Sequence, residues 1–441
     1  MIRNFLQDWL AAMLLICALL LGGASAAGVW ANAALSLLAL AAIGWALHAG
    51  AMRAMPCGLR WLAGSMIALP LLQLVPLPPS LWSALPGREG VARVFALIGG
   101  PSPWLPLSLD AEATLGAWLA LIVPMAMVLV ILASGPAGRR HAVQALVIGA
   151  VLALALGAAQ VAGGEGSRLY PYAFTNFGSA VGPFANRNHL ASLLLCALPA
   201  LAAVAPAHAG GRVVTWLGGA VLTAGVVLVG SGAGIAMLVP VVALTIWLGR
   251  SNGAQRPALA MLAVAGVLAG LAMIAAVFAV VRATNESGGV EVHRPFIVAT
   301  ALKAARDHFP AGSGAGTLRR IYPAYEDPGR IAGDYTAHAH CDYAEVLLEY
   351  GLPGALLILG VLVWWGSRLR VIWLAASDDR LARAGSAMVG VLLVHSLVDY
   401  PLRTAAMAAV AGLGAALAAR PPSLQGDVVG KAAPSHIRVT L

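Results

Sequence analysis

Charged residues are scarce in this chain. Only 10% of its 441 residues are Asp, Glu, Lys or Arg, whereas 60% are hydrophobic. A soluble domain carries roughly a quarter charged residues, so this composition excludes an ordinary soluble globular protein. Cysteine is scarce too: the chain has four cysteines and no Cys-x-x-Cys pair, and two of the four fall inside apolar runs. We therefore expect neither a disulfide framework nor a cysteine metal centre.

Long apolar runs take the place of charge. Runs of about 18 to 24 residues recur along the whole chain, which is the length an α-helix needs to cross the hydrocarbon core of a bilayer. The excess of Lys and Arg over Asp and Glu lies in short segments between these runs. It is not gathered on one face or tail, which argues against nucleic acid as a partner. We predict an all-α polytopic membrane protein with about 12 transmembrane helices in the lipid bilayer.

The predicted spans also fix a topology. If they alternate across the membrane, most loop arginines fall on one side and most acidic residues on the other. The positive-inside rule then puts both termini in the cytoplasm. Residues 1–420 form the predicted transmembrane domain, with a large periplasmic loop at 282–350, and residues 421–441 form a flexible cytoplasmic tail. The spans are 9–28, 29–50, 59–75, 113–134, 142–162, 189–206, 213–230, 234–249, 259–281, 352–367, 385–398 and 404–419.

Polar residues gather at the predicted outer boundary in two places. The first cluster, 186–189, reads Asn-Arg-Asn-His and opens a span. The second cluster lies between 338 and 345, ahead of another span, and contains His338 and His340. The loop between the two clusters carries further basic residues, among them Arg294. Polar groups at a membrane boundary cost free energy, so their clustering indicates a functional site.

Arginine and histidine together suit one kind of chemistry. The planar guanidinium holds phosphate oxygens in pairs and stays charged. A neutral imidazole accepts a proton from a hydroxyl group near neutral pH. Such groups suit the transfer of a group from a lipid pyrophosphate to a sugar hydroxyl. The arginines would neutralise charge on the leaving pyrophosphate, and the histidine would activate the acceptor.

Other interpretations of these residues stay open at this point. Arg187 at a helix start is also compatible with an interfacial anchor. His338 and His340 are compatible with a metal pair or with ordinary loop histidines. The stretch 312–316 lacks the Lys-Ser/Thr pair of a phosphate-binding P-loop, which favours a tight turn. A transporter or flippase would place charges near the bilayer midplane, whereas the polar groups here gather at the boundary.

Two motifs resemble a known family. Residues 182–189 read Gly-Pro-Phe-Ala-Asn-Arg-Asn-His, similar to the G-P-F-x-N-R-N-H stretch seen in many O-antigen ligase-like proteins. Residues 337–343 read Ala-His-Ala-His-Cys-Asp-Tyr, similar to that family's H-A-H-N-D-Y segment. The chain thus resembles the O-antigen ligase and polymerase family. It departs from the family at Cys341, where relatives have Asn, Ser or Gln, and at Gly232, where many have arginine.

The resemblance implies a fold similar to class C glycosyltransferases, in the bacterial inner membrane, with the active site facing the periplasm. It implies a glycosyltransferase without metal or cofactor that moves a glycan from undecaprenyl diphosphate to a sugar hydroxyl of lipid A-core. A polymerase that takes another lipid-linked glycan as acceptor is the alternative. His340 is then expected to be the catalytic base, with His338 in support. The expected substrate-binding residues are Arg187, Arg294, Asn186, Asn188, His189 and Tyr343.

Overall fold

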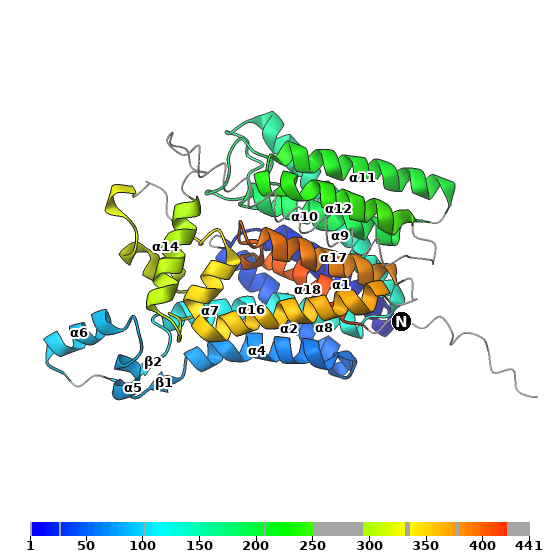
Figure 1. Ribbon diagram of the computed structural model, residues 1–441. Helices are drawn as coiled ribbons and strands as arrows, with labels where there is room; N and C mark the ends of the chain where they lie inside the picture. Colours follow the sequence, from blue (N-terminus) through cyan, green and yellow to red (C-terminus); the bar gives the residue numbers. More distant parts are fainter. Residues whose placement is uncertain are drawn as a thin grey trace, which may run out of the picture.

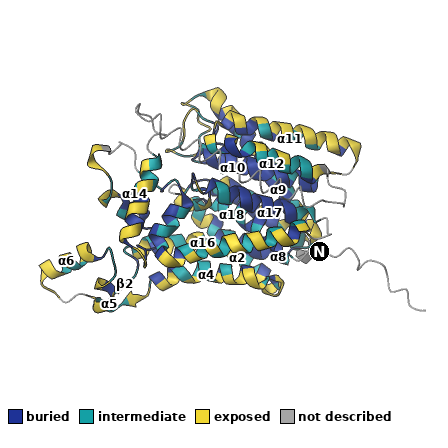
Figure 2. Ribbon diagram, viewed as in Figure 1, coloured by how far each residue is buried: buried dark blue, intermediate teal, exposed yellow. Residues whose placement is uncertain are grey.

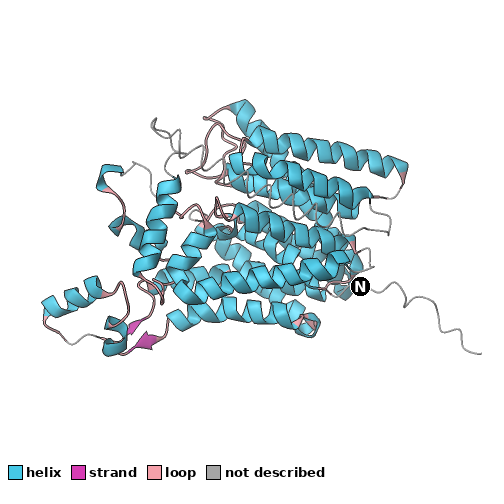
Figure 3. Cartoon of the chain, viewed as in Figure 1, coloured by secondary structure: helices cyan, strands magenta, loops and turns pink. Residues whose placement is uncertain are grey.

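The chain folds into a bundle of long helices (Figure 1). The computed structural model describes residues 2–25, 28–100, 103–206, 208–250, 294–330, 336–374 and 379–420. Within these ranges most of the backbone is helical, and the strands are confined to one short antiparallel pair, β1 (Pro76–Leu77) and β2 (Leu105–Pro106) (Figure 3). The all-α prediction is therefore confirmed for the described residues.

The helix starts follow from local chemistry. Asp110, Asn186, Asp379 and Thr404 each accept a hydrogen bond from a backbone N–H of the turn that follows, which satisfies a group the helix itself leaves unpaired. The α-helices are α1 (Ile2–Leu21), α2 (Val29–His48), α3 (Ala51–Ala54), α4 (Cys57–Gln73), α5 (Pro79–Ser83), α6 (Glu89–Ile98), α7 (Ala111–Ala120), α8 (Ile122–Ala133), α9 (Pro136–Gly163), α10 (Arg187–Val204), α11 (Ala209–Val229), α12 (Gly232–Arg250), α14 (Arg294–Asp307), α15 (Leu318–Ile321), α16 (Asp342–Leu374), α17 (Arg380–His395) and α18 (Ala405–Ala419). Short 3₁₀ turns are η2 (Tyr322–Ala324), η3 (Pro328–Arg330) and η4 (Pro401–Arg403).

Membrane-spanning helices are confirmed by length and composition. Among the described residues, 7 helices are long and apolar enough to cross a bilayer. Each predicted span except 259–281 overlaps a described helix, and 259–281 lies outside the described residues. The chain is thus a multi-pass membrane protein. The count of about 12 crossings and the likeness to class C glycosyltransferases stay predictions. The predicted tail, 421–441, also lies outside the described residues.

Three arginines gather at one end of the bundle. Arg368 donates hydrogen bonds to the carbonyl oxygens of Ala418 and Arg420, at 2.8 and 2.7 Å. Arg139 lies close enough to Arg420 for their charges to interact. These predicted cytoplasmic arginines therefore share one end of the bundle. Helices α6 and α14 lie at the other end, on the left of Figure 1.

Helix α16 starts earlier than the sequence predicts. The sequence predicts that 342–350 belong to the loop 282–350 and that the span begins at 352. The structure makes this segment helical from Asp342 onward, with a break at Gly351, where φ is 58°. Acidic residues on one face interrupt the apolar run and hide the first turns from a hydropathy pattern, which is the physical reason for the difference.

Buried residues are concentrated in α10, α17 and α18 (Figure 2). Helices α17 and α18 approach each other closely because glycine lies at their contact. A Cβ at Gly385 would lie 2.6 Å from the Cβ of Leu417 and 2.7 Å from the carbonyl oxygen of Gly414. Small residues of this kind let helix backbones pack tightly in a bilayer. The packing fixes the position of the link between the two helices, residues 396–404.

Replacing Gly385 with Ala should lower the melting temperature of the purified protein in detergent. The added methyl group would overlap Leu417 and Gly414, and overpacking of this kind costs about 1–3 kcal/mol. Gly44→Ala is the matched control, because Gly44 is also helical and a Cβ added there would have nothing within 4 Å of it. An unchanged melting temperature for the Gly385 variant would contradict this packing.

Candidate active site

A buried carboxylate, that of Asp399, lies at the centre of the site. Asp399 belongs to the link between α17 and α18, and its side chain is 1% exposed. The side-chain amides of Asn186 and Asn188, at the start of α10, donate hydrogen bonds to it. The backbone N–H of Tyr400 donates another, at 2.9 Å. The Nδ1 atom of His340 lies 3.6 Å from Oδ1 of the same carboxylate. Asp399 thus joins segments that lie far apart in the sequence.

His340 is held so that its ring lies against Asp399 and remains partly exposed at the protein surface. Its φ is 52°, a left-handed conformation that non-glycine residues adopt mainly where surrounding contacts enforce it. Its side chain is 23% exposed. Asp399 faces Nδ1, which favours the tautomer of the neutral ring with its proton on Nδ1 and leaves Nε2 as an acceptor. This is the arrangement that a general base requires.

Asp399 keeps its negative charge despite its burial. Burial alone would raise the pKa of its carboxyl group, but the interaction with His340 and the positive charge of Arg294 outweigh burial and hold the pKa well below its ordinary value. Arg294 begins α14 and is half-buried. This fixed negative charge lies 3.6 Å from Nδ1 of His340.

The ring of Tyr400 separates the histidines of the site. Its centroid lies 4.4 Å from that of His338 and 5.1 Å from those of His340 and His189. His189 is 1% exposed and lies between Tyr400 and Phe184, whose ring centroid is 6.2 Å away. Direct contact between His189 and a substrate would therefore require Tyr400 or Phe184 to move.

His338 forms a second histidine–carboxylate pair. Its Nδ1 atom lies 3.0 Å from Oε1 of Glu345, and its Nε2 atom lies 2.8 Å from the hydroxyl oxygen of Ser25. The other oxygen of Glu345 accepts a hydrogen bond from the backbone N–H of Ala339, at 3.0 Å. Both ring nitrogens of His338 are thus engaged, and the two neighbouring histidines face different carboxylates.

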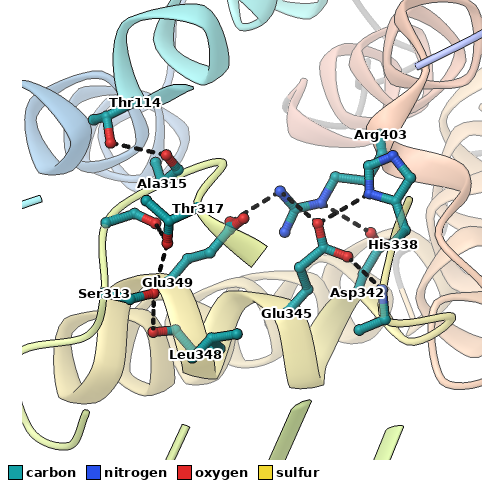
Figure 4. A network of polar contacts seen from close by, with 12 residues as sticks. Thr114, Ser313, Ala315, Thr317, His338, Asp342, Glu345, Leu348, Glu349 and Arg403 are labelled. Atoms are coloured by element: carbon teal, nitrogen blue, oxygen red, sulfur yellow. Dashed lines mark hydrogen bonds and ion pairs between the residues drawn. The ribbon is translucent and has the colours of Figure 1, made fainter. Parts of the chain in front are cut away.

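Arg403 ties this second pair to the link between α17 and α18 (Figure 4). Asp342, Glu345 and Glu349 are three and four residues apart on α16, so they share one helix face. The Arg403 guanidinium lies 2.9 Å from Glu349, 3.4 Å from Glu345 and 3.5 Å from Asp342. Asp342 also accepts a hydrogen bond from Ser396 Oγ at 2.7 Å. One arginine therefore holds the start of α16 against this link.

The remaining predicted site residues lie in different settings. The backbone N–H of Arg187 donates to the side-chain oxygen of Asn176 at 3.0 Å, and its half-buried side chain lies at the start of α10. The hydroxyl group of Tyr343 donates to the carbonyl oxygen of Leu393 at 2.8 Å, which fastens α16 to α17. The structure thus gathers Asn186, Asn188 and His340 around one carboxylate and uses Tyr343 in a helix contact. The roles predicted for these residues in substrate binding stay predictions.

Asp399, Tyr400 and Arg403 hold the site together, but no role was predicted for them from the sequence. In the predicted topology they only form the short link between the spans 385–398 and 404–419. A signal was present in the sequence: residues 399–403 read Asp-Tyr-Pro-Leu-Arg between two apolar runs. Two opposite charges in so short a link at a membrane boundary indicate partners elsewhere in the fold.

Two alternative site types find no support in the geometry. No group of three or more His, Cys, Asp or Glu residues in the described ranges is placed to hold a metal ion. His338 and His340 face separate carboxylates instead of a shared position. The glycine-rich stretch 312–316 is packed against backbone: a Cβ at Gly312 would lie 2.5 Å from the carbonyl oxygen of Glu349. It forms a tight turn, as its sequence predicts.

Arg403→Met should strongly destabilise the protein, because it leaves three carboxylates without their cation. Removing one partner of a buried ion pair costs about 3–5 kcal/mol, and thermal unfolding in detergent measures the loss. Adding Glu349→Gln to this variant should recover part of the stability, since one uncompensated charge is removed. Arg320→Met, at an exposed position, is the control. A melting temperature for Arg403→Met equal to that of the control would refute the role given to Arg403.

Comparison with known proteins bears on this site. A comparison with curated proteins gave no match. Among protein families, residues 217–359 match the O-antigen ligase family. The matched region includes α14, both histidines of the second cluster and the first turns of α16. The resemblance seen in the motifs is thereby confirmed for this part of the chain: residues 217–359 match the O-antigen ligase family.

Proposed function

We propose that the protein is a metal-independent glycosyltransferase of the O-antigen ligase type. It moves a glycan from undecaprenyl diphosphate to a sugar hydroxyl of lipid A-core at the periplasmic face of the inner membrane. The family match supports a membrane glycosyltransferase of the ligase or polymerase kind. The observation that carries the proposal is the pairing of His340 with the buried Asp399, at 3.6 Å.

The proposed reaction uses this pair as its base. The acceptor hydroxyl oxygen attacks the anomeric carbon of the donor, a new C–O bond forms, and the bond from that carbon to the diphosphate oxygen breaks. The acceptor proton passes to Nε2 of His340, and the Asp399 charge stabilises the resulting imidazolium. The electron pair of the broken bond leaves with the diphosphate, where Arg187 and Arg294 neutralise it.

The location of the site in the bundle supports a lipid-linked donor. His340 and Asp399 lie between helices and outside their long apolar stretches. Arg294, the first residue of α14, is close enough to Asp399 for their charges to interact, and α14 lies at one end of the bundle (Figure 1). A polyprenyl tail can stay in the bilayer while its diphosphate reaches this boundary. Arg139, Arg368 and Arg420 share the opposite end. The positive-inside rule makes that end cytoplasmic, which favours a periplasmic site.

A polymerase would use the same donor and the same base. It differs only in its acceptor, which is a second lipid-linked glycan instead of lipid A-core. An assay that offers both acceptors to the purified protein with one defined donor separates the two activities. Product on lipid A-core supports the ligase, and lengthened lipid-linked glycan as the sole product would replace it with the polymerase.

His340→Ala should reduce glycan transfer by at least about 100-fold, because a positioned general base contributes roughly that factor or more. The measurement is product formed by purified protein at saturating donor and acceptor, with protein abundance in the membrane recorded beside it. His48→Ala, an exposed histidine on α2, is the control and should transfer normally. Near-normal transfer by the His340 variant would overturn the proposed mechanism.

A further inference from the structure

We infer that Ser25 is an acceptor-binding residue, held in position by the His338–Glu345 pair. The inference rests on the proposed function and extends it to a group that binds the acceptor. Neither the motifs nor the family match includes Ser25, since the matched region begins at residue 217. It emerges from the three-dimensional contacts of the turn that follows α1.

Ser25 is the last residue of a polar network that also contains His338, Glu345 and Arg403. Its hydroxyl oxygen lies 2.8 Å from Nε2 of His338, and Nδ1 of His338 lies 3.0 Å from Glu345. Glu345 is itself held by the Arg403 guanidinium at 3.4 Å and by the backbone N–H of Ala339. The network therefore extends from the buried Arg403–Glu345 ion pair to the half-buried hydroxyl group of Ser25.

The protons in this chain can be assigned from the partners. Glu345 faces Arg403 and only accepts hydrogen bonds when ionised, so Nδ1 of His338 must donate to it. In the neutral ring Nε2 is then an acceptor, and the Ser25 hydroxyl donates its one proton to it. The lone pairs of the Ser25 oxygen remain free to accept, and the hydrogen bonds through His338 to Glu345 increase their basicity. They can accept a hydrogen bond from a sugar hydroxyl.

The turn that carries Ser25 is fixed against the first motif and against α18. The backbone N–H of Ala185, within the first motif, donates to the carbonyl oxygen of Gly23 at 3.1 Å. The backbone N–H of Ala406, in α18, donates to the carbonyl oxygen of Gly22 at 3.0 Å. Pro183 leaves no room for a side chain at Gly23. Ser25 thus enters the site on a well-anchored segment.

Ser25 is linked to the proposed base through His338 and one aromatic ring. Its partner His338 and the base His340 contact the same ring, that of Tyr400. A sugar acceptor offers several hydroxyl groups on neighbouring carbons. One of them can bind Ser25 while another presents its proton to Nε2 of His340. The hydrogen bond to Ser25 then adds to the affinity for the acceptor.

A nucleophilic role for Ser25 is the less suitable interpretation. Ser25, His338 and Glu345 have the order of groups found in serine hydrolases. That chemistry acts on an acyl group and needs donors for its oxyanion, whereas the donor proposed here carries its glycan on a diphosphate. A hydrogen-bonding role uses the same geometry and needs no additional reactant.

The test is a titration of lipid A-core acceptor at saturating lipid-diphosphate-linked glycan donor. Ser25→Ala should raise the acceptor KM about tenfold, as expected for the loss of one hydrogen bond to a polarised group. The kcat and the donor KM should stay within about twofold, and Ser25→Thr, which keeps the hydroxyl, should restore the acceptor KM. Ser167→Ala is the matched control, because Ser167 is also half-buried but bonds only a backbone N–H, that of Leu169.

The possible outcomes separate this inference from the proposed function. An active wild type with an unchanged acceptor KM in Ser25→Ala would refute the role of Ser25 alone. A loss of kcat with unchanged KM would refute it as well. A wild type that transfers glycan to no acceptor would refute the proposed function and this inference with it. Ser25→Cys keeps the shape but weakens the hydrogen bond, so a raised acceptor KM in that variant supports the inference if the alanine variant does not fold.

Discussion

The arrangement of the site depends on one buried negative charge, the carboxylate of Asp399. A carboxylate removed from water costs several kcal/mol unless it is paired and hydrogen-bonded. Asp399 meets this demand with two amides from the start of α10, a backbone N–H of its own link, and the imidazole of His340. Arg294 adds positive charge from α14. Because no single segment supplies enough partners, satisfying Asp399 brings the predicted motifs together.

The same short link also carries the opposite charge. Arg403, four residues after Asp399, holds the acidic face of α16 and with it the His338–Glu345 pair. Two histidines that are neighbours in sequence are thus assigned to two different carboxylates, and the Tyr400 ring lies against both. The close packing of α17 on α18 determines where this link lies. The five residues 399–403 therefore connect the packing of α17 on α18 at the glycine contact to the site at the bilayer boundary.

Much of the site could be predicted because polar residues are rare in this chain. Asn186, Asn188 and His340 stand out among apolar runs, and the structure brings all three to one carboxylate. The partner itself could not be predicted, since Asn186 and Asp399 are 213 residues apart and meet only through the packing of α10 against α17.

The fold shows the same division between local and long-range information. Apolar runs predicted a helix at every described span. The early start of α16 could not be read from hydropathy, because its acidic face is stabilised by Arg403, a residue from another part of the chain. The motif predicts Tyr343 as a site residue. Its hydrogen bond to α17 could not be predicted, because that bond depends on tertiary packing.

The central claim is that Asp399 acts through His340. A double-mutant cycle on kcat for glycan transfer, with Asp399→Asn, His340→Gln and the combined variant, tests it most directly. Asp399→Asn should lower kcat in the wild-type background and cause little further loss once His340 is replaced, because both changes impair the same base. Losses that multiply in the combined variant would show that the two residues act independently, and would refute the role given to Asp399.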